Sequence, residues 1–377
     1  MHEVAQEKLV HAIHDAGLRL VIAVTGGGSG AISALLGVAG ASRSILAATV
    51  PYAEGALVEW LGAKPEEFCS SRTARAMAMA AYEKARRFDP QGHCCGIGCT
   101  ASLVSDRPKR GPHRAHLAYQ TASTTATLSI DLEKGRRTRP EEESLVSTLV
   151  LNLIAEAAGL ADRLVVPLLA EELPQTACIV APSDRQDLLA GRIRTLACGA
   201  AHAEHPPRAV FPGAFNPLHQ GHTRMVQVAR QILGAEVAYE LSIVNVDKPP
   251  LDFLEIDARL RQFADDDAVW LSRAPRFMQK AGLFPGATFV VGCDTIERIG
   301  QVRYYGGQTA ALEAAIAEIA ERGCRFLVFG RQVAGRFQTA ADLQIPQSLA
   351  ALCQQVPESA FRQDISSTEL RRRQRDE

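Results

Sequence analysis

Apolar and polar positions recur along the first half of the chain with the periods of both helices and strands. Helices are predicted where apolar positions lie three or four apart, at residues 3–16, 70–87 and 141–158. Strands are predicted where apolar residues are continuous or alternate, at residues 18–24, 44–50 and 114–130. This mixture is typical of a layered α/β or α+β fold.

The second half alternates strand and helix patterns more regularly. Strands are predicted at residues 209–211, 236–244, 269–272, 288–291 and 326–329, and helices at 221–233, 257–264 and 310–322. Such alternation predicts βαβ units in a parallel sheet with right-handed crossovers. We expect an α/β protein of two domains, residues 1–165 and 207–377. Residues 166–206 are expected to form a connector. The transitional stretch around it, residues 161–207, would hold short strand-like runs at 164–169 and 177–180 and a helix at 183–195.

Composition narrows the functional class. The chain has 377 residues, is 47 % hydrophobic and 22 % charged, and carries a formal net charge of -1, which argues against a disordered chain and against a broadly basic nucleic-acid coat. No run approaches the roughly 18 apolar residues of a membrane span, and the first residues lack the apolar core of a secretory signal. We expect a cytoplasmic protein with small-molecule partners, without a nucleic-acid or membrane partner.

The nine cysteines form no spacing framework, which favours reduced thiols. Cys94, Cys95 and Cys99 lie close together in sequence, but no second ligand pair follows that would complete a zinc site. No residue is therefore assigned as a direct metal ligand.

The strongest motif is FPGAFNPLHQGH, residues 211–222, between a predicted strand and a predicted helix. In open α/β sheets, ligands bind at the carboxyl ends of strands. Gly213 and Gly221 allow the backbone to approach a bulky anion, and the helix presents its free N–H groups to it. His219 and His222 add hydrogen-bond donors, so this turn is predicted to bind phosphate.

A second motif, DISSTELR at residues 364–371, places three hydroxyls at a helix start with an arginine one turn later. A plain helix cap by Ser366 or Ser367 explains this motif when it is taken alone. The alternative is a second anion cradle, which the motif favours only when it is combined with the first motif.

Together the two motifs resemble the nucleotidyltransferase superfamily marked by (H/T)-x-G-H and I-S-S-T-x-x-R. The match extends over about residues 208–373, and Gly213-x-Phe215-Asn216-Pro217 is most similar to nicotinamide or nicotinate mononucleotide adenylyltransferases. The resemblance implies a Rossmann-like domain. It also implies Mg²⁺-dependent nucleotidyl transfer, with adenylyl from ATP as the first choice, to a phosphorylated acceptor that includes nicotinamide mononucleotide among its candidates.

The roles implied by the resemblance divide between the two motifs. His219 and His222 would contact the α-phosphate and stabilise charge during transfer, with Arg371 as the third catalytic residue. The resemblance assigns nucleotide binding to Gly213, Phe215, Gly221, Asp294, Arg331, Ser366, Ser367 and Thr368, of which the hydroxyl residues would hold the β- and γ-phosphates together with Arg371. Mg²⁺ would bridge the phosphates with few protein ligands.

Three of the implied positions have ordinary alternatives. Asp294, in GCD at residues 292–294, resembles the family's ribose-binding aspartate, but it could equally cap the following helix. Lys248 follows the second strand, where the family places an acceptor-binding lysine, and it could equally be a solvated loop residue. Arg331 resembles a position near the adenine and phosphates.

The first half resembles, more diffusely, the carboxyl-terminal domain of the CinA family, which includes nicotinamide mononucleotide deamidases. TGG at residues 25–27, GVAGAS at 37–42 and the Val50-x-Tyr52 pair carry the resemblance. The family's A-E-S-C-T-G-G reads IAVTGG here, and its lysine aligns with Leu57, so the original amidohydrolase chemistry is not expected. The glycine-rich turn at residues 25–30 is a candidate anion pocket. The basic run at 107–114 is explained by a solvated loop or, alternatively, by phosphate capture.

Two other functions stay open: cytidylyl transfer to a polyol-phosphate-like acceptor, and nucleotide sensing without turnover through a CinA-like binding domain. Domains of both resembled types self-associate, so a homo-oligomer is expected.

Overall fold

The structure, a computed structural model, describes residues 2–106, 110–201, 204–333 and 336–361. The chain divides into two compact units. The first unit comprises residues 1–189 together with residues 247–256, and the second comprises residues 190–246 and 257–377. Both units are α/β, as the hydrophobic pattern predicts, and no helix in the described part of the chain is long and apolar enough to cross a membrane.

The first unit is built on a six-stranded mixed sheet in the order β2-β1-β3-β4-β5-β6. The strands are β1 (Leu18–Thr25), β2 (Ile45–Thr49), β3 (His93–Ser102), β4 (His113–Gln120), β5 (Thr124–Leu132) and β6 (Gln175–Val180). β1 pairs in parallel with β2 and β3, and the remaining pairs are antiparallel.

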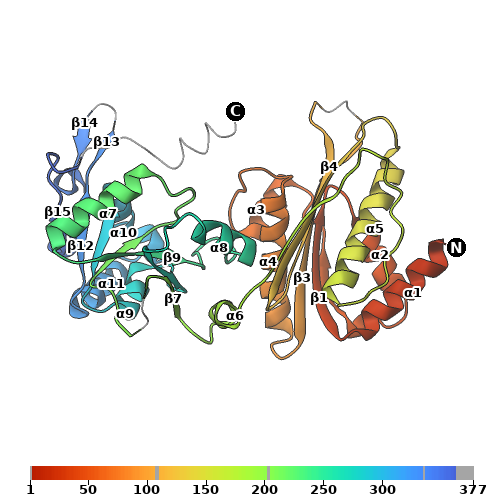
Figure 1. The fold of residues 1–377 in the computed structure, drawn as a ribbon, viewed down its shortest axis with the longest axis horizontal. Coiled ribbons are helices and arrows are strands. Elements are labelled where there is room, and N and C mark those ends of the chain that lie inside the picture. Colours follow the sequence, from red (N-terminus) through yellow and green to blue (C-terminus); the bar gives the residue numbers. More distant parts are fainter. Residues whose placement is uncertain (1, 107–109, 202–203, 334–335, 362–377) are drawn as a thin grey trace. The chain divides into compact units, whose positions relative to one another are not determined.

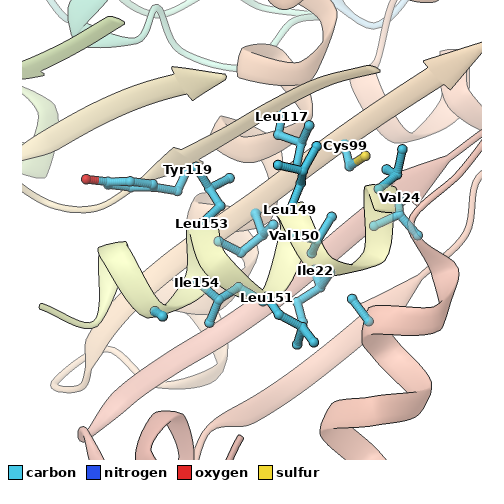
Figure 2. Packing of buried hydrophobic residues seen from close by; sticks show 14 of the residues in the cluster. Ile22, Val24, Cys99, Leu117, Tyr119, Leu149, Val150, Leu151, Leu153 and Ile154 are labelled. Carbon is cyan, nitrogen blue, oxygen red and sulfur yellow. The ribbon is translucent and has the colours of Figure 1, made fainter. Parts of the chain in front are cut away.

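Helices cover both faces of this sheet. α1 (His2–Asp15), α2 (Ser29–Gly37) and α5 (Arg139–Ala157) lie on one face, and α3 (Glu54–Leu61) and α4 (Ser71–Phe88) lie on the other (Figure 1). Figure 2 shows the main core, in which Leu149, Leu153 and Ile154 of α5 pack against the sheet. On the opposite face, Gly96 and Gly98 allow α4 to lie directly on β3, because a Cβ atom there would meet α4 backbone at 2.1–2.2 Å.

Two predicted strands of this unit are wrong. Residues 114–130, predicted as one strand, form the hairpin β4–β5, because the Thr121 hydroxyl accepts hydrogen bonds from the backbone N–H groups of Ser123 and Thr124 and turns the chain. Residues 164–169 form no strand. The Asn152 side-chain amide instead bonds to the backbone carbonyl and N–H group of Leu164. The Glu172 carboxylate accepts a hydrogen bond from the Leu169 N–H group.

The second unit contains a seven-stranded sheet in the order β15-β12-β11-β8-β9-β10-β7. The strands are β7 (Thr195–Gly199), β8 (Ala209–Pro212), β9 (Val237–Ser242), β10 (Ala268–Ser272), β11 (Thr288–Gly292), β12 (Arg325–Phe329) and β15 (Cys353–Gln355). All neighbours pair in parallel except β7 and β10. This parallel sheet with helical crossovers confirms the predicted Rossmann-like class.

The two faces of this sheet bury different helices. α9 (Phe277–Leu283), α10 (Cys293–Ile299), α11 (Thr309–Glu321) and α12 (Gln347–Ala350) contribute to a core with Val210, Phe289 and Phe326. α7 (Gln220–Leu233) packs on the other face with Phe211, Tyr239 and Val290. Residues 210 and 211 thus point to opposite faces, as alternate strand residues must. A short hairpin, β13 (Arg331–Val333) with β14 (Arg336–Gln338), follows β12.

The stretch predicted as a connector carries regular structure. β6 pairs in the first sheet, β7 pairs in the second, and α6 (Ser183–Ala190) lies between them in sequence. Residues 247–256, which belong to the first unit, follow β9 in the sequence and end within α8 (Phe253–Leu260).

Candidate functional site

The order of the strands in the second unit locates the candidate site. β8 lies in the middle of the sheet, with β9 and β10 on one side and β11 and β12 on the other. Chain connections therefore leave β8 and β11 in opposite directions, and such a switch point opens a ligand crevice at the carboxyl ends of the two strands. The loop after β8 ends at His219, His222 lies in the first turn of α7, and Asp294 lies in the first turn of α10, which follows β11. The H-x-G-H and G-x-D stretches thus follow the two strands at the switch point, and residues 364–371 lie outside the described residues.

The loop between β8 and α7 is shaped by one buried aromatic ring. Phe215 adopts a positive φ of 44° and is 1 % exposed, with its ring edge-on to Phe211, Tyr239 and Phe263. Gly213 is required beneath it, because a Cβ atom there would lie 2.5 Å from the Phe215 ring. The packing of the Phe215 ring against Gly213 therefore shapes this loop. Both residues are predicted nucleotide-binding residues. The Asn216–Pro217 peptide bond in this loop is cis.

His219 and His222 form a stacked pair at the start of α7. Their ring centroids are 3.7 Å apart with planes inclined by 23°. His219 is the N-cap of α7, and its Nδ1 accepts a hydrogen bond of 3.1 Å from the Gly221 N–H. His222 reaches back, and its Nδ1 accepts a hydrogen bond of 3.2 Å from the His219 N–H. The two imidazoles thus replace the serine and glutamate of an ordinary capping box.

This pairing determines the protonation of both rings. Because each Nδ1 accepts a hydrogen bond, each neutral ring carries its proton on Nε2. Burial, reinforced by the neighbouring His219, lowers the pKa of His222 to about 3, and burial also lowers the pKa of His219. At neutral pH the pair therefore offers two uncharged N–H donors at the positive end of the α7 dipole.

A hollow of about 440 Å³ lies along the first turns of α7. Gln220, Thr223, Arg224 and Gln227 line it from the helix. Residues 358–361 line the other side, and the Phe361 ring packs edge-on against Phe329 at 4.9 Å. Segments some 130 residues apart in the sequence thus meet along α7, and neither His219 nor His222 is among the residues that line this hollow.

The other predicted site residues have different positions. Gly221 is buried in the first turn of α7. Asp294 is exposed in the first turn of α10, whose N-cap is Gly292, so Asp294 is not the cap that the alternative interpretation required. Arg331 is exposed at the start of β13. Lys248 is exposed within residues 247–256, which belong to the first unit rather than to the unit with the histidines. Ser366, Ser367, Thr368 and Arg371 lie outside the described residues.

Sequence reasoning missed two residues that bind the loop before α7. Arg259 Nη1 donates to the Ala214 carbonyl at 2.9 Å. Gln262 accepts from the Leu218 N–H at 2.7 Å and donates to the Phe215 carbonyl at 3.1 Å. The helix pattern at residues 257–264 indicated a helix there, shifted from the observed α8, but no local signal indicated that these side chains reach a loop some 45 residues away.

The glycine-rich turn of the first unit is already occupied by a carboxylate of the chain. Glu143 of α5 accepts hydrogen bonds from the backbone N–H groups of Gly28 and Gly30 at 3.1 and 3.2 Å, and from the Ser29 hydroxyl at 2.8 Å. The expectation of an anion pocket at residues 25–30 is therefore corrected: the anion is Glu143. Of the basic run at residues 107–114, residues 107–109 lie outside the described part.

The cysteines show no sign of a metal site. All nine are free thiols, and in the described residues no three His, Cys, Asp or Glu side chains gather as metal ligands would. Burial raises the pKa of Cys94, and it raises that of Cys95 and Cys99 further, so these thiols stay protonated at neutral pH.

Comparison with solved structures finds proteins described as competence/damage-inducible or CinA-superfamily proteins. One, from Agrobacterium tumefaciens, is 19 % identical, covers 42 % of this chain and 95 % of its own, and has a TM-score of 0.33. Another, from Enterobacter asburiae, is 20 % identical, covers 42 % and 97 %, and has a TM-score of 0.32. A third, from Escherichia coli, is 16 % identical, covers 42 % and 87 %, and has a TM-score of 0.31. The motifs of the first half indicated the same family.

No curated protein matches the chain. The cytidylyltransferase-like family matches residues 210–373, a range that begins in β8 and contains both motifs on which the nucleotidyltransferase resemblance rests. Residues 210–373 therefore form a cytidylyltransferase-like nucleotidyltransferase domain.

Proposed function

We propose that the second unit transfers an adenylyl group from ATP to a phosphorylated acceptor and releases pyrophosphate. The observation that carries this proposal is the stacked pair of neutral imidazoles at the start of α7, beside the switch point of a parallel sheet. Such a pair carries one Nε2–H group on each ring, close to the backbone N–H groups of the first helical turn.

The proposed reaction needs no protein nucleophile. An oxygen of the acceptor phosphate attacks the α-phosphorus of ATP in line, the bond from that phosphorus to the β-bridging oxygen breaks, and pyrophosphate leaves. Negative charge increases on the α-phosphate oxygens as the bonds change. The Nε2–H groups of His219 and His222 would stabilise that charge, so catalysis rests on positioning and electrostatics. The triphosphate would in turn raise the pKa of both rings, because an anion favours the protonated form.

The β- and γ-phosphates are assigned to Ser366, Ser367, Thr368 and Arg371. Support comes from the last described residues, since Phe361 lines the same hollow as Gln220, the residue after His219. Ile365 lies four positions after Phe361, a span of at most about 14 Å for an extended chain. The signature therefore follows shortly after a segment that packs along α7. Mg²⁺ would enter bound to the triphosphate, with phosphate and water oxygens as its main ligands.

The choice of ATP rests on the similarity of Gly213-x-Phe215-Asn216-Pro217 to pyridine-mononucleotide adenylyltransferases. Nicotinamide mononucleotide is the first acceptor to test, since both halves carry motifs that resemble families of pyridine-nucleotide metabolism. Cytidylyl transfer is the second candidate, favoured by the description of the matching family.

The test incubates the full chain with Mg²⁺, ATP or CTP, and nicotinamide mononucleotide, nicotinate mononucleotide or a polyol phosphate, and measures pyrophosphate. We expect release with ATP and a pyridine mononucleotide. His222→Ala and Arg371→Ala should each lower kcat by about 100-fold or more. His205→Ala removes an exposed histidine outside the motifs and should leave the rate unchanged.

Release with CTP alone would replace adenylyl by cytidylyl transfer. If no pair gives pyrophosphate above the His222→Ala level, the proposed transfer is wrong. Tight binding of a mononucleotide without pyrophosphate would then favour a sensing role.

A further inference from the structure

Two side chains from one stretch of α8 and its end support the loop that precedes the histidine pair. Gln262 uses both ends of its amide, accepting from Leu218 N–H and donating to the Phe215 carbonyl, so that one side chain bridges the loop. Arg259, only 7 % exposed, donates to the Ala214 carbonyl. Residues 259 and 262 are three apart and therefore share one side of the helical turn.

The bridged loop determines the geometry of both imidazoles. His219 follows Leu218 directly, so the backbone position of Leu218 sets where α7 is capped. The Phe215 ring lies edge-on to the His222 ring, with centroids 5.2 Å apart and planes at 82°. Phe215 is 1 % exposed, and His222 also packs against Phe211 and His219. A change in the loop would therefore alter both the orientation and the hydration of the pair.

We propose that Gln262 and Arg259 are positioning residues, which hold residues 214–218 so that His219 and His222 stay stacked at the start of α7. Neither side chain needs to touch the substrate for this. The consequence for the rate rests on the proposed nucleotidyl transfer, whereas the positioning of the rings can be measured without any reaction.

Gln262 and Arg259 bind backbone groups of the loop, namely the Leu218 N–H and the Phe215 and Ala214 carbonyls. A buried carbonyl or N–H group left without a hydrogen bond costs about 1–3 kcal/mol. Replacing Gln262 by leucine removes one donor and one acceptor at nearly constant volume, so the loop must rearrange to bring water to Phe215 O and Leu218 N. Replacing it by glutamate keeps the acceptor for Leu218 and removes the donor for Phe215.

The first measurement is an NMR titration of ¹³C-labelled histidine in the full chain, with the two rings assigned through His219→Gln and His222→Gln. In the wild-type protein the pKa of His222 is about 3. We expect Gln262→Leu to raise it by at least one pH unit toward the solvated value, and Gln262→Glu to act in the same direction. Gln344→Leu, at an exposed glutamine of the same unit, is the control and should change nothing.

The second measurement is steady-state kinetics with ATP and the acceptor. We expect Gln262→Leu and Arg259→Met to lower kcat by about 10- to 100-fold, with a smaller change in KM, because a misplacement near 1 Å is sufficient for that loss. Arg259→Lys retains a charged donor and should recover part of the rate. The acid limb of the pH profile should move to higher pH in the variants.

The outcomes separate the two proposals. If Gln262→Leu shifts the histidine titrations but the wild-type protein releases no pyrophosphate, the positioning role is supported and the proposed reaction is contradicted. Unchanged titrations and an unchanged kcat in a folded Gln262→Leu protein overturn the positioning role. If Gln262→Leu fails to fold by circular dichroism, Gln262→Glu decides by the same two criteria.

Discussion

At the scale of single residues, hydrogen bonds to ring nitrogens decide the chemistry of the candidate site. The Nδ1 atoms of His219 and His222 both accept from backbone N–H groups, which leaves Nε2 as the donor on each ring. The motif H-x-G-H contains this information only in part. Its spacing permits a capping box, but the pKa of His222 is lowered by burial and by the neighbouring His219, and the rings of Phe211 and Phe215 pack against the imidazole.

The buried His222 predicts how stability depends on pH. Its pKa is about 3 in the folded chain and about 6.5 when solvated, so the unfolded chain binds more protons between these values. Stability should therefore fall as the pH is lowered through 6.5, by up to about 1.4 kcal/mol per pH unit from this group. Urea unfolding of the wild-type protein and His222→Gln, between pH 7.5 and 4.5, measures the difference. Equal slopes for the two proteins would contradict it.

A second residue-scale prediction concerns Gly213. Gly213→Ala places a methyl group 2.5 Å from the Phe215 ring and should cost about 1–3 kcal/mol of unfolding free energy. Gly282→Ala, in α9, is the control, because a Cβ atom there would only touch the Arg322 guanidinium at 3.5 Å. Fluorescence of Trp270 in a Trp60→Phe background reports unfolding of the second unit. A Gly213→Ala protein as stable as the control would show that Phe215 can move aside.

At the scale of elements, two glutamate carboxylates of the first unit accept hydrogen bonds from the backbone N–H groups of a helix start and of loops. Glu143 binds the start of α2, and Glu172 accepts from Arg137 and from the backbone N–H groups of Glu133 and Leu169. Glu172 is 3 % exposed, and its partners hold the irregular segment after α5 against the sheet. These interactions explain why helices and loops form there without strong local signals.

Glu172 predicts an acid-sensitive segment. Burial alone would raise the pKa of Glu172, but the hydrogen bonds from Arg137, Leu169 and Glu133 outweigh it and lower the pKa to about 2. The stabilisation is complete above about 4.5 and is lost as the pH falls toward 2. Glu172→Gln should therefore cost about 1–3 kcal/mol at pH 7 and progressively less below pH 4.5. Fluorescence of Trp60 in a Trp270→Phe background measures this, with the exposed Glu171→Gln as control; a pH-independent difference would contradict it.

Glu143 predicts a local rather than a global effect. Glu143→Ala leaves the Gly28 and Gly30 N–H groups without their carboxylate partner, so the first turn of α2 should exchange its amide hydrogens about tenfold faster. Hydrogen exchange read by mass spectrometry measures this. Glu7→Ala, at an exposed position of α1, should leave the exchange of the turn unchanged. Added inorganic phosphate should also leave it unchanged in the wild-type protein, because Glu143 already binds the turn.

At the scale of the whole molecule, sequence order and structural grouping differ at one segment. Residues 247–256 lie between two elements of the second unit in sequence but belong to the first unit. Asp252, 7 % exposed, binds Arg75 Nη1 through both carboxylate oxygens at 2.7 and 3.0 Å, and the Phe253 N–H donates to the Thr125 hydroxyl at 3.0 Å. Burial acts to lower the pKa of Arg75, yet Asp252 and Glu255 raise it overall.

Removing the Asp252 charge should release this segment. Asp252→Asn leaves the buried Arg75 without its main partner, so residues 247–256 should exchange their amide hydrogens at least tenfold faster. The core strands of the first unit should exchange as before. Asp265→Asn, at an exposed position, is the control. Unchanged exchange in the Asp252→Asn protein would show that Phe253 and its neighbours suffice to hold the segment.

The elements that sequence analysis predicted well are those with an uninterrupted period. Residues 221–233 were predicted as a helix that the structure extends by one residue to Gln220, and the strands of the second sheet fall near their predicted places. The hairpin at residues 114–130 was missed because alternation of period two continues through a turn that contains neither glycine nor proline. The positions of Arg259 and Gln262 were missed because no local pattern encodes a contact between distant segments.

The sequence by itself determined the class of both units, the start of α7 and the residues of the H-x-G-H motif, because these depend on period, capping and composition over short stretches. Only the tertiary structure decided that Glu143 occupies the glycine-rich turn, that the first unit includes residues 247–256, and that His222 is packed against Phe211 and Phe215. The physical reason is that burial and long-range hydrogen bonds depend on which surfaces meet when the chain folds, and a linear pattern does not specify those surfaces.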